Sequence, residues 1–360
     1  MRSSRGTGAS SMPSQAEHTA WIESLSPWPE EFGLGRMRTL LASLGDPHLA
    51  YPAIHVVGTN GKSTATRTIE ALLLAEGLSV GATISPHVRS WSERITVDGR
   101  EADFETALAR VRPEAELKGA TQFESLTAAA FAEFAARQVD VAVVEAGLGG
   151  RFDATNVLRT HVVLLTNVGL DHTDVLGETR EEIAAEKLAV VKEGAVTVLP
   201  DREFAGLAGP NVVFGGAREA AAAFLGRPVE REPEIVLPGR FERRGDELWD
   251  GAHNPDGARW LLERLPPGER VVLASILADK DVEAMLETLS RAGRTLVATR
   301  SSNTRALPAE ELARRAAPYF DRVDAVEEPH AALARARELG GPILVTGSLY
   351  LLADLSRNGT

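Results

Sequence analysis

Apolar residues along this chain follow two alternating patterns, which together predict its fold. Short runs that are apolar at almost every position alternate with segments in which apolar residues recur every three or four positions. The first pattern is typical of strands buried on both faces of a sheet, and the second is typical of helices that cover a sheet. Their alternation favours parallel strands joined by helical crossovers. In the first part of the chain we expect strands at 54–57, 78–84, 139–144 and 162–165 and helices at 19–44, 65–75, 125–137 and 180–191.

The pattern weakens between Gly206 and Pro238, where alanine, glycine and proline replace clear periodicity, so we place a domain boundary there. Beyond it strands and helices alternate again, without a Gly-x-Gly-x-x-Gly motif after the first strand that would support a dinucleotide site. The sequence thus predicts an α/β protein in which a P-loop-containing, mostly parallel sheet ATPase domain is followed by a smaller Rossmann-like α/β domain. The expected parts are a disordered N-terminal tail (1–14), a central ATP-binding domain (15–236) and a C-terminal domain (238–360), the last with strands at 271–276, 295–299, 323–326 and 343–345 and helices beginning near Val282, Pro308 and Pro329.

A glycine-rich turn joins the first predicted strand to the helix that follows it. The turn reads Gly58-Thr59-Asn60-Gly61-Lys62 and leads into the hydroxyl groups of Ser63 and Thr64. Backbone N–H groups at such a turn, the helix dipole and the lysine charge suit a polyphosphate. The common nucleotide-binding motif has four residues between its glycines, whereas this turn has Thr59 and Asn60 only, so an incidental glycine turn is the alternative. The flanking strand and helix favour phosphate binding, with Thr64 or Ser63 contacting a magnesium ion.

Three further polar residues follow predicted strands at the same edge of the sheet. Ser85, Glu145 and His172 each come at or just after the carboxyl end of an apolar run. Because ligands of open parallel sheets bind beyond this edge, we expect these side chains to share a crevice with the phosphate loop. Magnesium takes one or two carboxylates together with phosphate oxygens, which makes Glu145 a candidate ligand. The alternatives are an ion pair between Glu145 and Arg151, and a histidine satisfied within its own loop.

Lys187 is the least expected residue of the predicted helix at 180–191. Thr179 and Glu182 have the spacing of a capping box, and Ile183, Lys187 and Val191 stand at positions i, i+4 and i+8. The lysine therefore lies on the apolar face. It either extends its ammonium group to water or turns toward the crevice, where burial would lower its pKa and make the amine reactive.

A compact polar segment, Asp250-Gly251-Ala252-His253-Asn254-Pro255, follows a short predicted strand of the second domain. Asp250 and Asn254 could act only as turn and helix caps. Two such residues with a histidine between them favour a ligand contact, and we expect Arg240 to be the partner.

Composition narrows the range of partners. The chain is 44% hydrophobic and 25% charged, has a net charge of −12 and no cysteine, and contains no apolar run long enough to cross a membrane. The negative charge argues against a nucleic-acid partner. Residues 1–14 lack the apolar centre of a secretory signal. We expect a soluble, cytoplasmic monomer without disulfides or thiolate metal sites.

With these residues described, the chain resembles the dihydrofolate synthase/folylpolyglutamate synthase family of the Mur ligase superfamily. Each motif alone is weak, but they occur in the order of the family between Gly35 and Leu352. The motifs are the turn at 58–62, Ser85-Pro86-His87 with Glu93-Arg94-Ile95, the segment 145–156, the His172 loop, Ala185-Glu186-Lys187, the segment 250–255 and Gly347-Ser348-Leu349-Tyr350-Leu351.

The resemblance implies an ATP-dependent acid–amino-acid ligase. It would convert a pteroate or folate carboxylate to an acyl phosphate and join it to L-glutamate, using ATP and two magnesium ions, with a carbamylated Lys187 as a metal ligand and closure of the two domains to exclude water. The implied catalytic residues are Lys62, His172, Lys187 and His253; the metal ligands are Thr64, Ser85, Glu145, His172 and Lys187; the nucleotide contacts are Gly58, Thr59, Asn60, Gly61, Lys62, Ser63, Thr64, Arg240, Asp250 and Asn254; and the substrate candidates are Arg94, Arg151, Asp153, Thr155, Asn156 and Ser348.

Two features depart from the family pattern. Ser63 stands where the family usually has a second loop glycine, which would stiffen the loop or change which hydroxyl group contacts the metal. The stretch before Pro238 is short, and its usual Gly-x-His-Gln element with an alanine-rich helix is missing or reduced to Gly215–Leu225. We therefore expect part of an accessory sheet of the first domain to be absent, which bears on the folate site.

Two other functions stay open from the residues alone. A ligase of the same superfamily that acts on a peptidoglycan precursor would share the phosphate loop but not the Ser-Pro-His, Asp-Ala-Thr-Asn and Gly-Ser-Leu-Tyr-Leu set. A nucleotide-binding scaffold without chemistry would not need Lys187 on an apolar helix face. The sequence does not decide between dihydropteroate, a reduced folate or both, nor the number of glutamates added.

Overall fold

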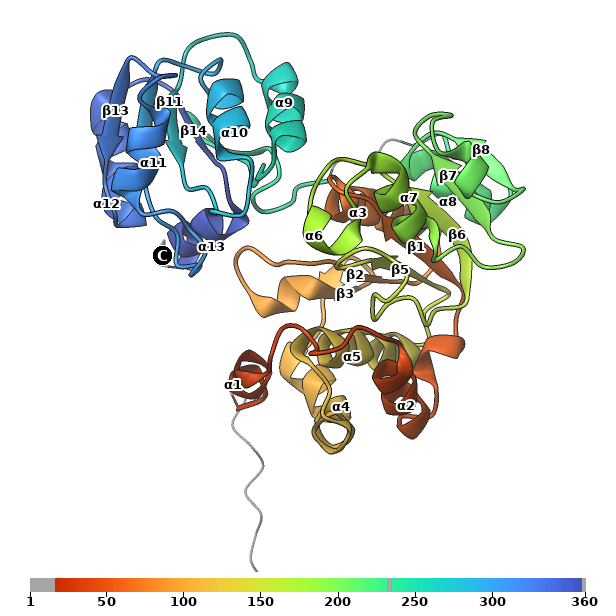
Figure 1. The fold of residues 1–360 in the computed structure, drawn as a ribbon. Coiled ribbons are helices and arrows are strands. Elements are labelled where there is room, and N and C mark those ends of the chain that lie inside the picture. Colours follow the sequence, from red (N-terminus) through yellow and green to blue (C-terminus); the bar gives the residue numbers. More distant parts are fainter. Residues whose placement is uncertain (1–16, 232, 234, 358–360) are drawn as a thin grey trace, which may run out of the picture.

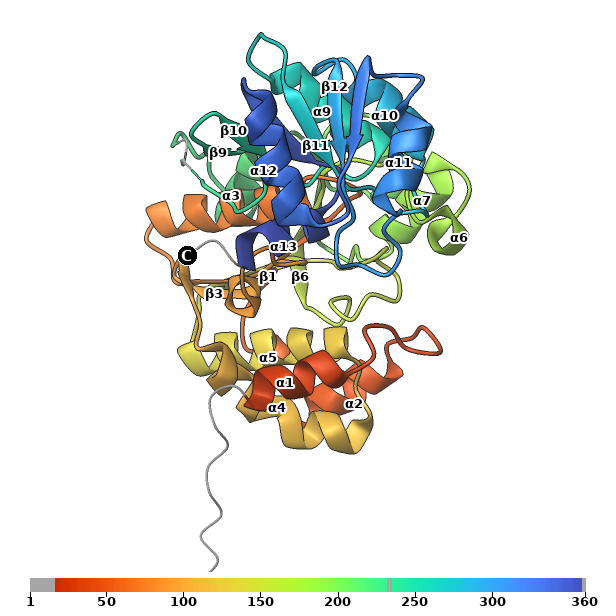
Figure 2. The ribbon, with the colours of Figure 1, turned by 90° about the vertical axis from the view of Figure 1, so that its left-hand side faces the viewer.

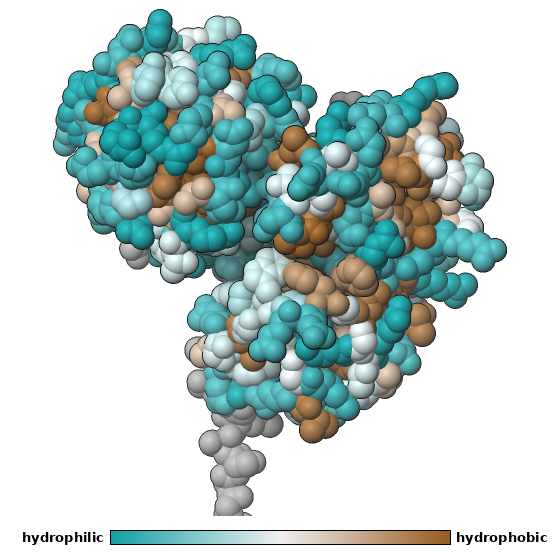
Figure 3. Space-filling model, in the orientation of Figure 1, coloured by the Kyte–Doolittle hydropathy of each residue, from teal (hydrophilic) through white to brown (hydrophobic). Residues whose placement is uncertain are grey.

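The computed structural model describes residues 17–231, 233 and 235–357, so the predicted disordered tail at 1–14 lies outside the described residues. The described chain forms two domains, each built on one sheet (Figure 1). In the space-filling view the two domains are separate lobes with a furrow between them (Figure 3). The predicted α/β architecture is confirmed.

The first domain contains an eight-stranded sheet with the order β4-β3-β2-β5-β1-β6-β7-β8. Neighbours from β2 to β8 pair in parallel, whereas β3 and β4 form an antiparallel edge. The central strands β1 and β5 are buried at every position, as their apolar runs predict. The strands are β1 Ala53–Val57, β2 Val80–Thr83, β3 Ile95–Val97, β4 Arg100–Glu101, β5 Val141–Glu145, β6 Thr160–Leu165, β7 Val196–Leu199 and β8 Val212–Phe214.

Helices cover both faces of this sheet, and alternate residues of each strand supply the two faces. Ile54 belongs to one buried cluster with Leu72 of α3, whereas its neighbour Ala53 belongs to another with Phe134 of α5. Figure 2 shows α1, α2, α4 and α5 together on one side of the sheet. The helices are α1 Glu17–Ser24, α2 Gly35–Ser43, α3 Lys62–Ala75, α4 Phe104–Lys118, α5 Gln122–Arg137, α6 Thr173–Leu176, α7 Arg180–Leu188 and α8 Ala217–Leu225, with 3₁₀ turns η1 Pro47–Leu49, η2 Trp91–Arg94 and η3 Ala205–Leu207.

The single helix predicted at 19–44 is wrong. The chain forms α1 and α2 instead, separated by a non-helical segment that contains Pro27 and Pro29. Proline removes a backbone donor and restricts the residue before it, so two prolines two residues apart interrupt a helix whose apolar spacing otherwise continues. The helix α7 also stops at Leu188, three residues earlier than predicted.

The second domain is a six-stranded sheet with the order β13-β12-β11-β14-β10-β9, parallel except for β9. From β11 the chain proceeds to β12 and β13 on one side and then returns to β14 on the other, so the topological switch point lies between β11 and β14. The elements are β9 Glu242–Arg244, β10 Glu247–Trp249, β11 Val271–Ala274, β12 Thr295–Ala298, β13 Arg322–Ala325, β14 Ile343–Thr346, α9 Pro255–Arg264, α10 Val282–Leu289, α11 Ala309–Ala316, α12 Pro329–Leu339 and α13 Leu349–Arg357.

The weakly patterned stretch before the second domain contains only short elements. After β7 come η3, β8 and α8, and Ala220 and Ala221 of α8 are buried in the cluster that includes α3. The alanine-rich segment therefore remains as a cover for the sheet. Among the described residues, the first domain has no second sheet. Within the same ranges, none of the helices combines the length and apolar character needed to cross a bilayer.

Gly81 provides a test of the packing between β2 and α5. A Cβ atom at Gly81 would lie 2.4 Å from Cδ1 of the Phe134 ring. We expect Gly81→Ala to lower the free energy of unfolding by about 1–3 kcal/mol, because a methyl group in a filled core displaces its neighbours. Urea unfolding measures this loss. Gly33→Ala is the matched control, since nothing lies within 4 Å of a Cβ atom there; equal midpoints for the two variants would contradict the prediction.

Candidate functional site

The turn at 58–62 links β1 to α3, and hydrogen bonds to the loop after β6 hold it in place. A Cβ atom at Gly58 would lie 1.9 Å from Oγ1 of Thr166, so only glycine fits there. Asn60 N donates to Oδ1 of Asn167 at 2.9 Å, and Gly169 N donates to Oγ1 of Thr59 at 3.0 Å. These contacts preform the loop at the start of a helix, which is the arrangement that binds phosphate.

Glu145 ends β5 beside this loop and is almost fully buried. Its Oε2 atom accepts hydrogen bonds from Oγ of Ser63 at 2.8 Å and from the backbone N of Ser85 at 2.9 Å. Burial raises the pKa of Glu145, while the Lys62 ammonium opposes this shift. The alternative ion pair with Arg151 does not form, because Arg151 pairs with Glu186 at 3.0 Å.

Lys187 lies inside the protein and not at its surface. Its side chain is on α7, only 4% of the residue is exposed, and Nζ donates to the carbonyl oxygen of Gly58 at 3.0 Å. Burial and the nearby Lys62 ammonium lower the pKa of Lys187 to about 7. The inward orientation expected from the apolar helix face is therefore present, and the lysine contacts the phosphate loop directly.

His172 occupies a left-handed conformation with φ of 53° just before α6. Burial lowers the pKa of His172, and the Lys187 charge lowers it further, whereas the Asp171 carboxylate raises it. The net lowering leaves the imidazole neutral near pH 7. A neutral ring nitrogen is the form that can bind a metal ion. The first-domain candidates Lys62, Glu145, His172 and Lys187 thus meet at one sheet edge.

Asp171 joins the two domains through contacts that sequence reasoning missed. Its Oδ1 atom pairs with Nζ of Lys280 at 2.6 Å, and both side chains are only 8% exposed. Its Oδ2 atom accepts from Nδ2 of Asn254 at 3.1 Å and lies 3.8 Å from Nε2 of His253. The sequence indicates these contacts only in that each of the residues follows a buried strand by a few positions.

Asn254 has two structural tasks that explain its place in the polar segment 250–255. It is the N-cap of α9, where Oδ1 accepts from Gly257 N at 2.8 Å, and its amide exchanges hydrogen bonds with the Asn60 amide at 3.2 and 3.0 Å. Cap and ligand-site interpretations are therefore compatible. Because Asn60 belongs to the phosphate loop, α9 of the second domain is fixed against that loop.

Asp250 is buried next to the half-buried Arg240, and no hydrogen bond joins the two side chains. Asp250 accepts backbone hydrogen bonds from Phe241 at 2.8 Å and Ala252 at 2.9 Å. Burial raises the pKa of Asp250, whereas the Arg240 charge lowers it. Burial lowers the pKa of Arg240. The Glu145 carboxylate of the first domain opposes this lowering of the Arg240 pKa, so the two groups lie within electrostatic reach of each other. His253 is neutral, because burial lowers its pKa to about 4.

A small cavity opens next to Glu145. Its lining includes Ser85, Arg94, Phe123 and Thr155. Nε of Arg94 donates to Nδ1 of His87 at 3.0 Å, and its guanidinium group lies 4.8 Å from the centre of the Trp91 ring. Burial lowers the pKa of Arg94 to about 10, which leaves the group charged near neutral pH. The apolar wall and the half-buried Arg94 cation match an aromatic ligand that carries a carboxylate, although the cavity, at about 10 Å³, has to widen to admit one.

The other substrate candidates serve mainly to shape loops. Asp153 accepts from the backbone N atoms of Leu148 at 2.8 Å and Thr155 at 3.0 Å. Asn156 bonds to the carbonyl oxygen of Arg151 at 2.9 Å. Ser348 is 1% exposed, and its hydroxyl accepts from Tyr350 N at 3.1 Å. The structure thus brings Arg94 and Thr155 to the cavity, and does not place Ser348 or Asn156 there.

The donor set fits a magnesium ion that shares its coordination with phosphate. No group of three or more His, Asp or Glu side chains is suitably clustered within the described chain. Magnesium does not require one, since it keeps waters and takes phosphate oxygens. Glu145 supplies one carboxylate whose Oε1 atom accepts no hydrogen bond from the described residues, while Ser63 and the backbone N of Ser85 contact its Oε2 atom. The Lys187 nitrogen can donate an electron pair to a metal ion only while its amine is uncharged.

Comparisons with known proteins cover both domains of this chain. The model for the Mur ligase middle domain matches residues 56–212, and the model for the Mur ligase glutamate ligase domain matches residues 239–349. A structure of Mycobacterium tuberculosis folylpolyglutamate synthase complexed with ADP and AMPPCP superposes with a TM-score of 0.87 at 29% identity, covering 95% of this chain and 98% of that one. A structure of E. coli FolC in complex with DHPP and ADP gives 0.85 at 27% identity, with 96% and 98% coverage. Fold and site together define a Mur-type, ATP-dependent glutamate ligase.

Curated relatives show to which family of Mur-type ligases the chain belongs. The dihydrofolate synthase/folylpolyglutamate synthase of Mycobacterium tuberculosis is 31% identical over 436 aligned positions, which cover 94% of this chain and 90% of the relative. The folylpolyglutamate synthase of Lacticaseibacillus casei is 32% identical over 93% of this chain and 96% of its own length. The chain belongs to the dihydrofolate synthase/folylpolyglutamate synthase family. An alignment of 436 positions against a chain of 360 residues requires gaps in this chain.

The ion pair between Asp171 and Lys280 gives a pH-dependent prediction. Burial would raise the pKa of Asp171, but Lys280 outweighs it and lowers this pKa from 3.8 to about 2. The pair therefore stabilises the fold above pH 3.8, and its contribution disappears as the pH falls through about 2. We expect Lys280→Met to lower the free energy of unfolding at neutral pH by about 2–4 kcal/mol, because it leaves a buried carboxylate unpaired.

Urea unfolding at a series of pH values measures this difference. It should shrink between pH 3.8 and about 2, where the wild-type carboxylate also loses its charge. Lys118→Met, at the end of α4, is the control and should change little at any pH. A difference between wild type and Lys280→Met that stayed constant over this range would show that Asp171 does not carry the effect.

Proposed function

We propose that this ligase joins L-glutamate to the carboxylate of dihydropteroate or of a reduced folate, with ATP split to ADP and phosphate. The observation that carries the proposal is the meeting of the phosphate loop, Glu145 and Lys187 at one sheet edge, next to a cavity lined by Arg94 and Phe123. Related structures were solved with ADP, AMPPCP and DHPP, which supports the assignment of ATP and of the acid as substrates.

ATP would bind with its phosphates on the turn at 58–62. The backbone N–H groups and Lys62 hold the β- and γ-phosphates, and the hydroxyl groups of Ser63 and Thr64 lie at the same helix start. From the second domain, Arg240, Asp250 and Asn254 close over the nucleotide. His253 and the Lys62 ammonium are near the transferring group, where a neutral imidazole can donate or accept a hydrogen bond.

Magnesium would be held by Glu145, with Ser85 or Thr64 and His172 as further contacts. When bound, the ion neutralises charge on the phosphate oxygens during transfer. A related Yersinia pestis structure was solved with AMPPNP and a Mn ion. A second ion near His172 belongs to the same proposal.

The acid substrate would bind beside Glu145 once the cavity there, about 10 Å³ in this structure, has widened, with Phe123 against its ring system and Arg94 near its carboxylate. The carboxylate attacks the γ-phosphorus of ATP, which forms an acyl phosphate and releases ADP. The uncharged amine of L-glutamate then attacks the carbonyl carbon and expels phosphate. Closing the furrow between the domains excludes water, which would otherwise hydrolyse the acyl phosphate.

We also propose that Lys187 is carbamylated. Its amine is buried on the phosphate loop, at 3.0 Å from the carbonyl oxygen of Gly58. An uncharged amine adds to carbon dioxide with loss of one proton, and the resulting carbamate carries a negative charge. This change would replace a buried ammonium group near Lys62 by an anion that attracts Lys62 and a metal ion.

The two alternative functions are not favoured by any observation. The relatives that span most of this chain include folate ligases at 31% and 32% identity, so a peptidoglycan precursor is set aside as the substrate. A scaffold without chemistry would not keep Glu145 and Lys187 buried against an open loop. We further propose that the enzyme acts as a monomer in the cytoplasm, which a chain without cysteine suits.

Phosphate release tests the proposed reaction. In the presence of ATP and L-glutamate, we expect turnover only when dihydropteroate or tetrahydrofolate is added, because the acyl phosphate needs the acid substrate. Omitting glutamate should leave only slow hydrolysis. Lys62→Met should reduce turnover by roughly 100-fold or more, since it removes the charge on the γ-phosphate. Stimulation by a muramyl precursor and by neither folate compound would refute the proposal.

Carbon-13 NMR tests the carbamate on Lys187. With ¹³C-bicarbonate, the wild type should show a carbamate signal that is absent from Lys187→Met. Lys187→Ala should lose turnover by roughly 100-fold, and a small carboxylate such as formate should restore part of it. Lys118→Ala is the control and should behave like wild type. An unlabelled wild type, or full activity of Lys187→Ala without added carboxylate, would remove the proposed role.

A further inference from the structure

One stripe of α3 is polar although it is buried inside the first domain. Ser63, Arg67 and Glu70 stand at positions i, i+4 and i+7 and so lie on the same side of the helix. Ser63 is 5% exposed, Glu70 is 3% exposed, and the Arg67 side chain is 11% exposed. The buried side of a helix is usually apolar, so these three side chains call for a specific reason.

The hydroxyl of Ser63 bonds to Glu145, whereas Arg67 and Glu70 form an ion pair that the proposed reaction does not use. Nη1 of Arg67 donates to Oε2 of Glu70 at 2.7 Å, and it also donates to the Thr96 hydroxyl. The Thr96 hydroxyl in turn donates to Oε1 of Glu70 at 2.6 Å, which closes a ring of three side chains between α3 and β3. Replacing a buried ion pair by apolar side chains is often neutral for stability, so stability alone does not account for this ring.

The second terminal nitrogen of Arg67 holds the loop between β2 and β3. Nη2 donates to the backbone carbonyl oxygen of Glu93 at 2.6 Å. The Glu93 carboxylate is buried and accepts from three successive backbone N atoms of the same loop, those of Val88, Arg89 and Ser90, at 2.9, 2.6 and 3.0 Å. Glu93 is thus the centre of the loop, and Arg67 fixes this centre to α3.

The same loop reaches both Glu145 and the cavity beside it. At the start of the loop, the backbone N of Ser85 donates to Oε2 of Glu145 at 2.9 Å. At its end, Arg94 follows Glu93 directly and lines the cavity. Nε of Arg94 donates to Nδ1 of His87, another residue of the loop, at 3.0 Å. The position of the Arg94 guanidinium group therefore depends on the folded shape of the whole loop.

Helix α3 joins these contacts to the phosphate loop. It begins at Lys62, and Arg67 lies five residues later, about 7.5 Å along the helix axis. Because a hydrogen-bonded helix is rigid over this distance, the start of α3 and the Glu93 carbonyl group keep a fixed separation. The phosphate loop and the cavity are in this way connected through one guanidinium group.

We propose that Arg67 is a positioning residue for the acid substrate of the ligase. By holding Glu93, it fixes the loop 85–94 so that Arg94 stays at the cavity, and it does so from the helix that begins at the phosphate loop. The inference rests on the proposed function, because Arg94 is there assigned to the carboxylate of the acid. Arg67 takes part in no chemical step and acts through Arg94.

Steady-state kinetics of Arg67→Lys tests this role. An ammonium group can keep the pair with Glu70 but cannot also reach the Glu93 carbonyl oxygen, because it lacks the fork of a guanidinium group. We expect the KM for dihydropteroate or tetrahydrofolate to rise about tenfold, as for the loss of a hydrogen bond from a charged group. The KM for ATP should stay within about twofold. A purely structural role of Arg67 would leave the KM for the acid unchanged at a temperature where the variant is folded.

Two further variants test whether Arg67 acts through Arg94. Arg67→Met/Glu70→Met removes both charges, so it leaves no unpaired buried ion and should fold; it should also raise the KM for the acid about tenfold. Arg94→Met removes the group through which Arg67 acts, so introducing Arg67→Lys into this variant should raise the KM by less than about twofold further. Full multiplication of the two effects would overturn the proposal, as would an unchanged KM in both Arg67 variants.

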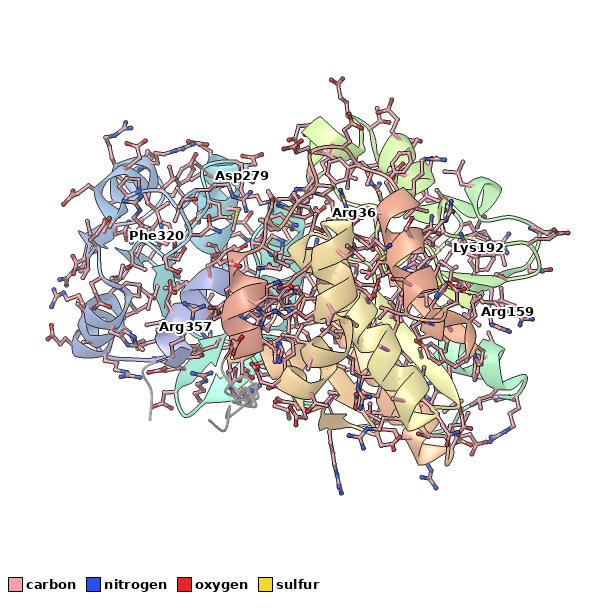
Figure 4. The ribbon with its side chains drawn as sticks, turned by 90° about the horizontal axis from the view of Figure 1, so that it is seen from below. Arg36, Arg159, Lys192, Asp279, Phe320 and Arg357 are labelled. Atoms are coloured by element: carbon pink, nitrogen blue, oxygen red, sulfur yellow. The ribbon has the colours of Figure 1, made fainter. Side chains whose placement is uncertain are left out.

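Hydrogen exchange of the segment 85–94 tests the loop on the full chain without substrate. In Arg67→Lys we expect the amide hydrogens that bond to the Glu93 carboxylate to exchange about tenfold faster than in wild type. Arg137→Met is the matched control, because it removes an arginine from another 2.7 Å pair with a buried glutamate, Glu133 of α5. Figure 4 shows α4 and α5 in front of the sheet, on the face opposite α3.

Exchange and kinetics together separate the outcomes. Unchanged exchange in Arg67→Lys would overturn the proposal whatever the turnover. Faster exchange with an unchanged KM for the acid would overturn it as well, since the loop would then be held without positioning the substrate. Faster exchange in a protein whose wild type shows no folate-dependent turnover would count against the proposed function, while it would support the hold of Arg67 on the loop.

Discussion

Burial of the Glu145 carboxylate at the end of β5 is the constraint on which the crevice depends. A carboxylate taken out of water is unfavourable unless donors and cations surround it. Here Ser63 and Ser85 supply two hydrogen bonds, while Lys62 and Arg240 supply positive charge from the phosphate loop and from the second domain. The surroundings of this one side chain thus connect the strand end, the loop and the second domain, and none of the described residues donates to its Oε1 atom, which can therefore accept an external cation.

Asp171 plays the corresponding part where the domains meet. Its charge is compensated by Lys280, and its second oxygen by the Asn254 amide, which in turn bonds to Asn60 of the phosphate loop. The orientation of the second domain is therefore coupled to the conformation of the loop. A nucleotide that contacts Asn60 has to fit or rearrange the same set of hydrogen bonds, so binding in the crevice and the relative position of the domains are not independent.

The sequence predicted the features that follow from local patterns. Buried strands and their carboxyl ends are visible as apolar runs followed by polar residues, so the meeting of Glu145 and His172 with the loop was foreseeable. The pairing of Asp171 with Lys280 was not, because 109 residues separate them and neither lies in a motif that implies the other. For the same reason the sequence left an ion pair between Glu145 and Arg151 open as an alternative: Glu186, the actual partner of Arg151, lies on α7 and reaches the turn only in the folded chain.

Ser63 shows how a departure from a family pattern is absorbed by the structure. A glycine at this position would leave Oε2 of Glu145 with a single donor, the backbone N of Ser85. The serine hydroxyl adds a second donor at 2.8 Å, and a hydroxyl that donates its proton keeps its lone pairs available. The side chain therefore fixes the carboxylate without giving up its own capacity to accept a contact. The Ser63 hydroxyl is thereby held against Glu145 at the point where α3 begins, so a change in this carboxylate would reach the start of the helix directly.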